Sequence, residues 1–257
     1  MVQAPPDSAL KSVATALEIL ELVVMSPGEL GVSEIAAQLG VAKGGVHRHL
    51  QTLVSRGYLW QNPQTSRYRA GIQCHLLGRM AAESVTLLSA AEQPMRQLRD
   101  SFGLTVTLAT PRGSKVLIIE RLFGTMPLEI GVRPGSEFEL HATSQGKVFL
   151  AFGKSTLWKS LEGRKLAAPT DHAITNLTVL AQQCEKIQSQ GWAMAAEESA
   201  IGINAISAPV FDAKGSCIAA LTLVASIQNL PRKPAKNMVL GLQEAAKAVS
   251  AQLGFRA

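Results

Sequence analysis

The chain has 257 residues, a length that predicts about two domains. Apolar residues make up 47% of it and charged residues 17%, which is typical of globular proteins and excludes disorder throughout. The formal net charge of +6 and the pI near 9.4 are compatible with a polyanionic partner.

The first nine residues are expected to form a disordered lead. They lack the basic stretch and apolar core of a secretion signal, and no run in the chain approaches the roughly 18 apolar residues that span a bilayer. The cysteines, Cys74, Cys184 and Cys217, are far apart and form no C-x-x-C pair. This spacing is typical of reduced thiols. We therefore expect a cytoplasmic protein with no membrane span, metal or cofactor.

Residues 10–70 carry the pattern of a winged helix-turn-helix. Ser33 is a plausible N-cap for a second helix, Gly40 supplies its C-terminal break, and a third helix is predicted from about Ala42 to Ser55. A turn cluster at residues 62–65 predicts a β-hairpin wing after it. The first helix is predicted from an apolar stripe with steps of three and four, formed by Leu10, Val13, Leu17, Leu20 and Val24.

Charge is sorted within this segment. No Asp or Glu lies between Glu34 and Glu83, whereas the basic residues there are Lys43, Arg48, Arg56, Arg67, Arg69 and Arg79. A helix-turn-helix with a basic wing is suited to lie against phosphates. The alternative is a helix and a hairpin that carry solvated charges without a DNA role.

The third helix and the wing supply the residues expected to meet DNA. Arg48 is the expected base reader, because its guanidinium fits guanine O6 and N7, and Gly44 can offer backbone N–H groups to a phosphate. Arg67 and Arg69 alternate with Tyr68, so both arginines are expected on one face, at phosphate or in the minor groove, with Tyr68 toward the core. The candidates are Lys43, Gly44, His47, Arg48, Gln51, Arg67 and Arg69.

A connecting helix is predicted over residues 71–88, and residues 89–257 are predicted to form an α+β domain. Strands are expected at Thr105–Thr110, Lys115–Leu122, Leu128–Val132, Ile203–Phe211 and Cys217–Ala225. Helices are expected near Gly146–Phe152, Thr156–Leu161 and Thr178–Gln190, with a last one through Val239, Leu242, Ala246, Val249 and Leu253.

Several segments resemble the IclR family of bacterial transcriptional regulators. They are L-K-S-V-A-T-A-L-E-I-L-E-L from Leu10, S-E-I-A-A-Q-L-G-V-A-K-x-x-V-H-R from Ser33, and R-G-Y-L…S-R-Y-R-A-G in the wing. The likeness continues through L-H-A-T-S-Q-G-K at Leu140–Lys147, the Glu197-Glu198 pair and I-S-A-P-V-F-D-A-K-G at Ile206–Gly215. It implies a winged helix-turn-helix, a linker helix and a GAF-like effector-binding domain.

The resemblance also implies partners. These are a roughly palindromic double-stranded DNA operator, a small organic acid or aromatic effector, and further copies of the chain in a homodimer or dimer of dimers. Gly44 and Gly45 stand where the family usually has small hydroxyl residues. We expect this change to weaken DNA affinity or to alter base preference, because each glycine costs up to ~1 kcal/mol of helix stability relative to Ala.

The resemblance further implies an effector pocket. Ala205 and Val224 replace a family Cys and a family hydroxyl residue, so we expect a more apolar pocket, which favours an aromatic or branched carboxylate. The alternative is that these residues only pack the core. The pocket residues implied are Ser144, Gln145, Ile203, Ala205, Thr222 and Val224, with Ile130 and Phe138 as an apolar wall.

None of the candidate catalytic motifs in the sequence is complete. Gly153-Lys154-Ser155-Thr156 resembles the end of a P-loop, but Val148 stands at the required earlier glycine. Thr143-Ser144-Gln145-Gly146 is not G-x-S-x-G. We expect a regulator and not an enzyme. The alternatives are a sensor whose winged helix mediates protein–protein contacts and a catalytic GAF-like domain that turns over a bound acid.

Overall fold

The computed structural model describes residues 10–84, 86–126 and 130–256. The chain divides into two compact units, Met1–Ser84 and Val85–Ala257. The expected disordered lead, residues 1–9, lies outside the described residues.

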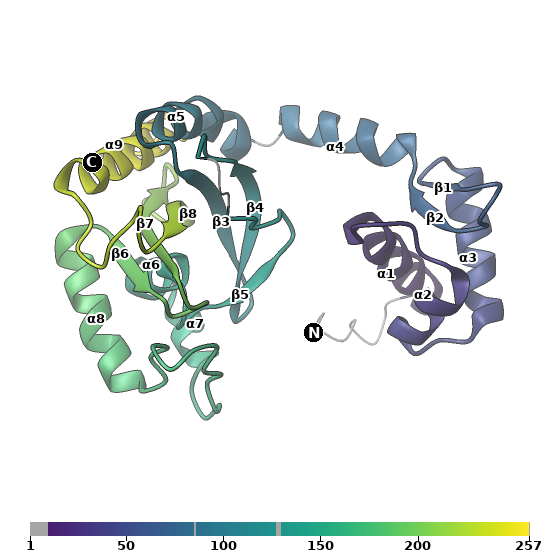
Figure 1. Ribbon diagram of the computed structural model, residues 1–257, viewed down its shortest axis with the longest axis horizontal. Coiled ribbons are helices and arrows are strands. Elements are labelled where there is room, and N and C mark those ends of the chain that lie inside the picture. Colours follow the sequence, from purple (N-terminus) through teal and green to yellow (C-terminus); the bar gives the residue numbers. More distant parts are fainter. Residues whose placement is uncertain (1–9, 85, 127–129, 257) are drawn as a thin grey trace. The chain divides into compact units, whose positions relative to one another are not determined.

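The N-terminal unit is a helical domain with a small hairpin. Gly40 ends the second helix in the left-handed conformation, with φ of 66°, and its N–H bonds back to the carbonyl of Ala36. The two short strands pair antiparallel, with Trp60 opposite Arg69. The elements are α1 (Lys11–Met25), α2 (Val32–Leu39), α3 (Lys43–Ser55), β1 (Leu59–Gln61), β2 (Tyr68–Ala70) and α4 (Ile72–Ser84) (Figure 1).

The core of this unit corrects the stripe predicted for α1. Ile19 and Val23 are buried, whereas four of the five predicted positions are exposed, Leu10 by 73%. Of that stripe, only Leu20 packs against the core. Because α1 is apolar around most of its circumference, more than one stripe satisfies the helical period, and only the packing against α2 and α3 selects the buried one.

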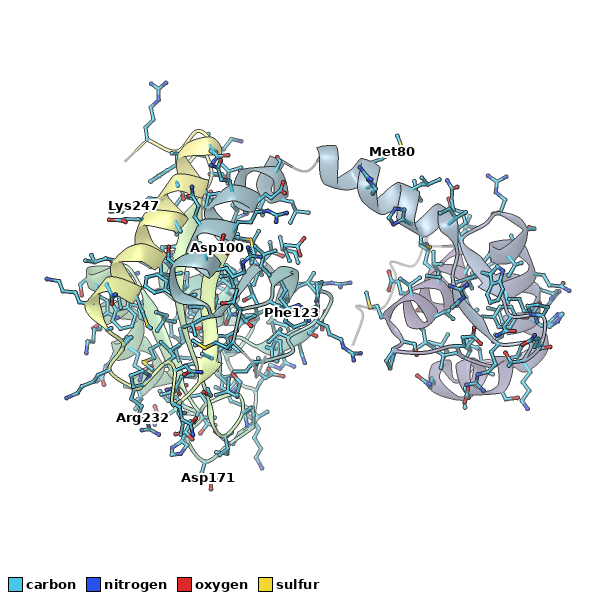
Figure 2. The ribbon with its side chains drawn as sticks, turned by 45° about the horizontal axis from the view of Figure 1, so that its top comes forward. Met80, Asp100, Phe123, Asp171, Arg232 and Lys247 are labelled. Carbon is cyan, nitrogen blue, oxygen red and sulfur yellow. The ribbon has the colours of Figure 1, made fainter. Side chains whose placement is uncertain are left out.

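The connecting helix also differs from its predicted extent. It ends at Ser84, and the next helix, α5, begins at Thr86, with residue 85 outside the described part of the chain. Met80 projects away from α4 (Figure 2). Ile72, Leu76 and Leu77 are exposed on the same helix. Most large apolar side chains of α4 therefore have no cover within the N-terminal unit.

The C-terminal unit is a six-stranded antiparallel sheet with helices on both faces. The strand order is β5-β4-β3-β8-β7-β6. Its elements are α5 (Thr86–Phe102), β3 (Thr105–Arg112), β4 (Lys115–Leu122), β5 (Glu137–Glu139), α6 (Ser144–Phe152), α7 (Ser155–Lys159), α8 (Leu177–Gln190), β6 (Ala193–Ala196), β7 (Ile203–Phe211), β8 (Cys217–Ser226) and α9 (Lys236–Gln252).

One strand prediction fails in this unit, and two short strands, Glu137–Glu139 and Ala193–Ala196, were not predicted. Residues 130–132 of the expected strand Leu128–Val132 form no strand, and residues 127–129 lie outside the described part. Ile130 instead lines a cavity, and Val132 packs against a core cluster. Pairing with β4 begins only at Glu137, after the chain has turned at Gly135. The strand Ala193–Ala196 was not predicted, because short runs of Ala and Met carry little β signal.

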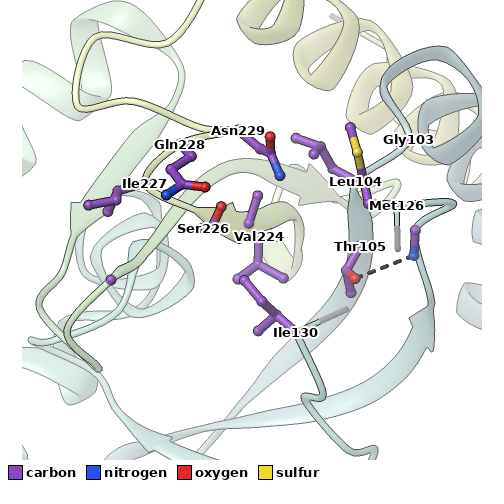
Figure 3. A pocket seen from close by; sticks show the side chains of 13 residues that line it. Gly103, Leu104, Thr105, Met126, Ile130, Val224, Ser226, Ile227, Gln228 and Asn229 are labelled. Atoms are coloured by element: carbon purple, nitrogen blue, oxygen red, sulfur yellow. Dashed lines mark hydrogen bonds between the residues drawn. The ribbon is translucent and has the colours of Figure 1, made fainter. Parts of the chain in front are cut away.

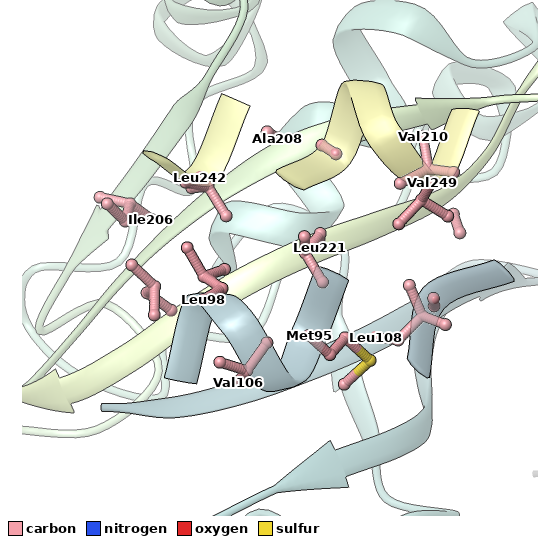
Figure 4. Close-up of a cluster of buried hydrophobic side chains, with 14 of the residues drawn as sticks. Met95, Leu98, Val106, Leu108, Ile206, Ala208, Val210, Leu221, Leu242 and Val249 are labelled. Carbon is pink, nitrogen blue, oxygen red and sulfur yellow. The ribbon is translucent and has the colours of Figure 1, made fainter. Parts of the chain in front are cut away.

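The two faces of the sheet have different chemistry because side chains alternate along each strand. One face is apolar and packs under α5 and α9 (Figure 4). On the opposite face, Thr105, Thr107, Ser207 and Thr222 stand among small apolar residues. Helix α6 packs against this second face, so buried hydroxyl groups lie between the helix and the sheet.

Candidate functional site

Helix α3 presents one exposed face that carries all five of its predicted DNA-binding residues. The buried face consists of Val46, Leu50 and Leu53, which packs the helix into the core. Added Cβ atoms at Gly44 and Gly45 would meet nothing within 4 Å, so the glycines are not required by packing. The exposed residues are Lys43, Gly44, His47, Arg48 and Gln51.

On the wing, Tyr68 is buried, which confirms its predicted inward direction. Arg69 is exposed, and its guanidinium lies 4.3 Å from the centre of the Trp60 ring on the paired strand. This cation–π contact orients the arginine while leaving its N–H donors available. The nearest carboxylate is that of Glu29, with Oε1 3.9 Å from Arg69 Nε.

Arg67 has different surroundings. Its Nη2 lies 2.6 Å from Glu34 Oε2, and its Nε and Nη2 donate to the carbonyl of Glu29 at 3.0 and 2.8 Å. The N–H of Gly31 donates to the same Glu34 oxygen. Hydrogen bonds from Gly31 and Arg67 hold the pKa of Glu34 below its usual value. Arg67 therefore joins the wing to the start of α2, a role that the alternating pattern did not indicate.

The C-terminal unit contains a cavity of about 330 Å³ at one end of the sheet (Figure 3). Its lining includes Thr105 of β3 with the preceding Leu104, Val224 and Ser226 of β8, and Ile130 from the connection between β4 and β5. The hydroxyl of Thr105 accepts a hydrogen bond from the N–H of Gly124 at 3.4 Å. Two of the predicted effector residues, Ile130 and Val224, thus share one cavity.

Three more predicted residues belong to a buried polar network beside this cavity. Ser144 Oγ lies 2.6 Å from Ser207 Oγ, which lies 2.7 Å from Thr222 Oγ1. Gln145 Nε2 donates to Thr107 Oγ1 at 3.4 Å. Thr107 pairs with Thr222, two positions along the sheet from the pair of Thr105 with Val224 that borders the cavity.

The three remaining predicted residues lie in different places. Ala205 pairs with Val224 and Ile203 pairs with Ser226, so both stand beside cavity residues on the same sheet. Phe138, on β5, packs against the core cluster under α6 and does not line the cavity. The structure does not bring it to the other candidates.

Sequence reasoning missed Thr105, Thr107 and Ser207. Alternation from Ala205 places Ser207 on the same face as that residue, so this signal was present in the sequence. Thr105 and Thr107 needed the strand order, because β3 and β8 are neighbours only in the folded sheet.

Lys147 and Glu198 form a buried ion pair that was also missed. Lys147 Nζ lies 2.6 Å from Glu198 Oε1 and donates to the carbonyl of Met194 at 3.4 Å. The pair ties α6 to the segment after β6. Burial lowers the pKa of Lys147, against the opposing effect of the Glu198 carboxylate. A lysine within the apolar run of α6 was the available signal.

Within the described ranges, no group of three or more His, Cys, Asp or Glu side chains is placed to hold a metal ion. Over the same residues, no helix combines the length and hydrophobicity needed to cross a bilayer.

Comparison with known proteins identifies relatives over nearly the whole chain. The HTH-type transcriptional regulator XynR of Escherichia coli K12 is 29% identical, covering 96% of this chain and 99% of the relative. The regulator KdgR of the same organism is 27% identical, over 99% and 98%. These relatives are transcriptional regulators with DNA-binding domains.

Solved structures include relatives with the same fold. An IclR regulator from Alicyclobacillus acidocaldarius has a TM-score of 0.87 at 27% identity, covering 96% of this chain and 100% of that one. An IclR homologue from Microbacterium hydrocarbonoxydans, solved with 4-hydroxybenzoate, shares the fold with a TM-score of 0.83 at 21% identity, over 94% and 98%.

The family models match in two parts. The IclR helix-turn-helix domain matches residues 12–63. The C-terminal domain of the bacterial transcriptional regulator IclR matches residues 79–251, more than half of the chain. The chain therefore belongs to the IclR family of bacterial transcriptional regulators.

Proposed function

We propose that this chain is a sequence-specific, cytoplasmic DNA-binding regulator, without enzymatic activity, whose affinity for its operator is set by a small organic acid. The observation that carries the DNA-binding part is the exposed face of α3. Lys43, His47 and Arg48 share it, and residues 35–82 contain no acidic side chain that could oppose a phosphate. A surface of this kind gains affinity by releasing counterions from DNA.

The proposal gives the candidates different roles. Arg48 reads a guanine edge in the major groove, and Lys43 contacts phosphate near the start of the helix. Gly44 offers its backbone N–H there. Arg69, whose guanidinium packs over the Trp60 ring, is the residue of the wing that contacts DNA. Arg67 holds the wing in position relative to α2, because its N–H donors are bonded to the carbonyl of Glu29 and the carboxylate of Glu34.

The effector is proposed to occupy the cavity of about 330 Å³, a volume within the range of small-molecule sites. Ile130 and Val224 would contact its apolar part, and its carboxylate would lie toward the buried hydroxyl network of Ser144 and Thr222 beside the cavity. The replacement of a hydroxyl residue by Val224 favours an aromatic or branched acid. The structural relative solved with 4-hydroxybenzoate supports an aromatic acid as the first candidate.

The proposed mechanism requires a homodimer or a dimer of dimers. Two winged domains would contact two half-sites roughly one helical turn or more apart. Residues 10–70 would bind DNA, residues 71–88 would link, and residues 89–257 would bind the effector. The exposed apolar side chains of α4 support self-association through the linker. Effector binding would change the spacing of the paired wings and so the fit to the operator.

The test begins with selection of operator fragments from genomic DNA by the purified chain. Operator affinity is then titrated with 4-hydroxybenzoate and branched carboxylates. We expect an acid to change the affinity, and an Ile130→Trp variant, which fills the cavity, to keep DNA binding but lose that response. Equal operator affinity with and without every bound acid would refute the regulatory part of the proposal. An absence of salt dependence would favour protein contacts over DNA contacts.

A further inference from the structure

The C-terminal unit holds a second cavity, of about 370 Å³, that shares no lining residue with the first. It lies between the C-terminal ends of α6 and α8 on one side and α9 on the other, with β7 as its floor. Its volume falls within the range of small-molecule sites. None of the candidates of the proposed function lines it.

Three aromatic rings stand around this cavity. Phe211 of β7 is at their centre, with the ring of Phe255 stacked on it at 5.0 Å and 29°. The ring of Phe152, at the end of α6, meets Phe211 edge-on at 5.7 Å and 87°. All three line the cavity and are only half-buried. A flat apolar ring would find both stacking and edge-on partners here.

The uncharged polar groups around the cavity are already engaged. Gln188 Nε2 donates to the carbonyl of Ala151, and Gln243 Nε2 donates to that of Gln190 at 2.9 Å. These amides satisfy carbonyl groups near the ends of α6 and α8. Ser250 Oγ donates to the carbonyl of Ala246 and accepts from the N–H of Phe211.

Lys247 is the exception among the polar residues of the lining. It projects from α9 (Figure 2), is exposed, and makes no hydrogen bond or ion pair with any described residue. It is also the lining's only charged side chain. An apolar cavity with one unpaired cation at its edge is complementary to an apolar molecule with one negative charge.

We propose that this cavity is a second small-molecule site, which takes a flat aromatic carboxylate with its ring against Phe211 and its carboxylate at Lys247. Ring burial supplies most of the affinity, because an ion pair with an exposed lysine adds little. Lys247 supplies the preference for an acid over a neutral compound of the same shape.

The experiment is calorimetric titration of the full chain with 2-naphthoate and with the neutral 2-naphthalenemethanol. Ala251 is exposed on α9 and lines the cavity, so Ala251→Trp fills it without disturbing the core. We expect this variant to lose a naphthoate site that the Ile130→Trp variant, which fills the first cavity, retains. Lys247→Met should weaken naphthoate roughly twofold to fivefold, leave the alcohol unchanged, and be rescued by Lys247→Arg. Unchanged thermal unfolding of each variant confirms that its fold is intact.

The outcomes separate this proposal from the proposed function. Loss of a site in Ala251→Trp alone supports the second cavity, whatever happens at the first. Naphthoate binding that Ala251→Trp leaves at the wild-type level overturns the proposal, and leaves an effector in the first cavity possible if Ile130→Trp abolishes it. An equal loss of naphthoate and alcohol in Lys247→Met overturns the assignment of an acid. Absence of naphthoate binding to the wild type overturns the proposal outright.

Discussion

Replacing Lys147 by Met would break the buried ion pair while keeping a long apolar side chain. The two side chains are 0% and 8% exposed, and the second oxygen of Glu198 is buried without a hydrogen-bond partner. The variant would therefore leave a carboxylate in the interior with no cation. Removing one member of a buried pair costs about 3–5 kcal/mol. At roughly 2–4 °C per kcal/mol for a unit of this size, the unfolding temperature should fall by about 6–20 °C.

The assay is thermal and urea unfolding of the full chain in a Trp60→Phe background, followed by fluorescence of Trp158 and Trp192, which lie in the same unit as the ion pair. The control is the double variant Lys147→Met with Glu198→Leu, which removes both charges. Replacing a buried pair by apolar residues is often neutral, so most of the lost stability should return. A double variant as unstable as the single one would show that lost packing, and not an unpaired charge, explains the effect.

Three further predictions concern other parts of the chain. Glu34→Gln should leave the charge of Arg67 without a neutralising carboxylate while Arg67 stays bonded to the carbonyl of Glu29, so operator binding should tighten and the slope of log K against log salt should steepen by up to about 0.9. Gly44→Ala should stabilise α3 by about 0.5–1 kcal/mol, because the added methyl meets no neighbour, and should slow hydrogen exchange in that helix. Burial raises the pKa of Cys184 to about 11 and that of Cys217 to about 12, so iodoacetamide at pH 8 should label neither thiol before unfolding.

Each of these has an outcome that contradicts it. An unchanged salt slope in Glu34→Gln would mean that the charge of Arg67 does not act on DNA even when Glu34 no longer neutralises it. Faster exchange in Gly44→Ala would show that the helix start depends on the glycine. Mass spectrometry that finds either buried thiol alkylated in the native chain would contradict its burial.

Local signals predicted the winged helix-turn-helix well. Gly40 ends α2 as its position indicated, and Tyr68 turns inward as the alternation around it required. The predicted N-cap was wrong, because α2 begins at Val32 with Gly31 as its cap and Ser33 inside its first turn. The partner of Arg67 was beyond such reasoning, because Glu34 lies 33 residues away and is joined to it only by the fold. The alternation predicts the direction in which Tyr68 points, but it carries no information about which residues the side chain of Arg67 contacts.

The C-terminal site was harder to predict for a related reason. Ser144 and Thr222 come together through Ser207, and this requires α6 to pack on one particular face of β7 and β8. Phe138 was expected in the pocket because it is apolar, yet its place on the edge strand puts it against another cluster. Strand order, which no local pattern encodes, decides these cases.

The most direct test of the central claim is binding of the purified chain to DNA from upstream of its own gene, with excess nonspecific competitor. Arg48→Ala is compared with Arg96→Ala, an exposed arginine on α5 in the other unit. The account predicts competitor-resistant binding that Arg48→Ala abolishes and Arg96→Ala leaves intact. Failure of a genome-wide selection to find any fragment that the wild type holds more tightly than Arg48→Ala would contradict it.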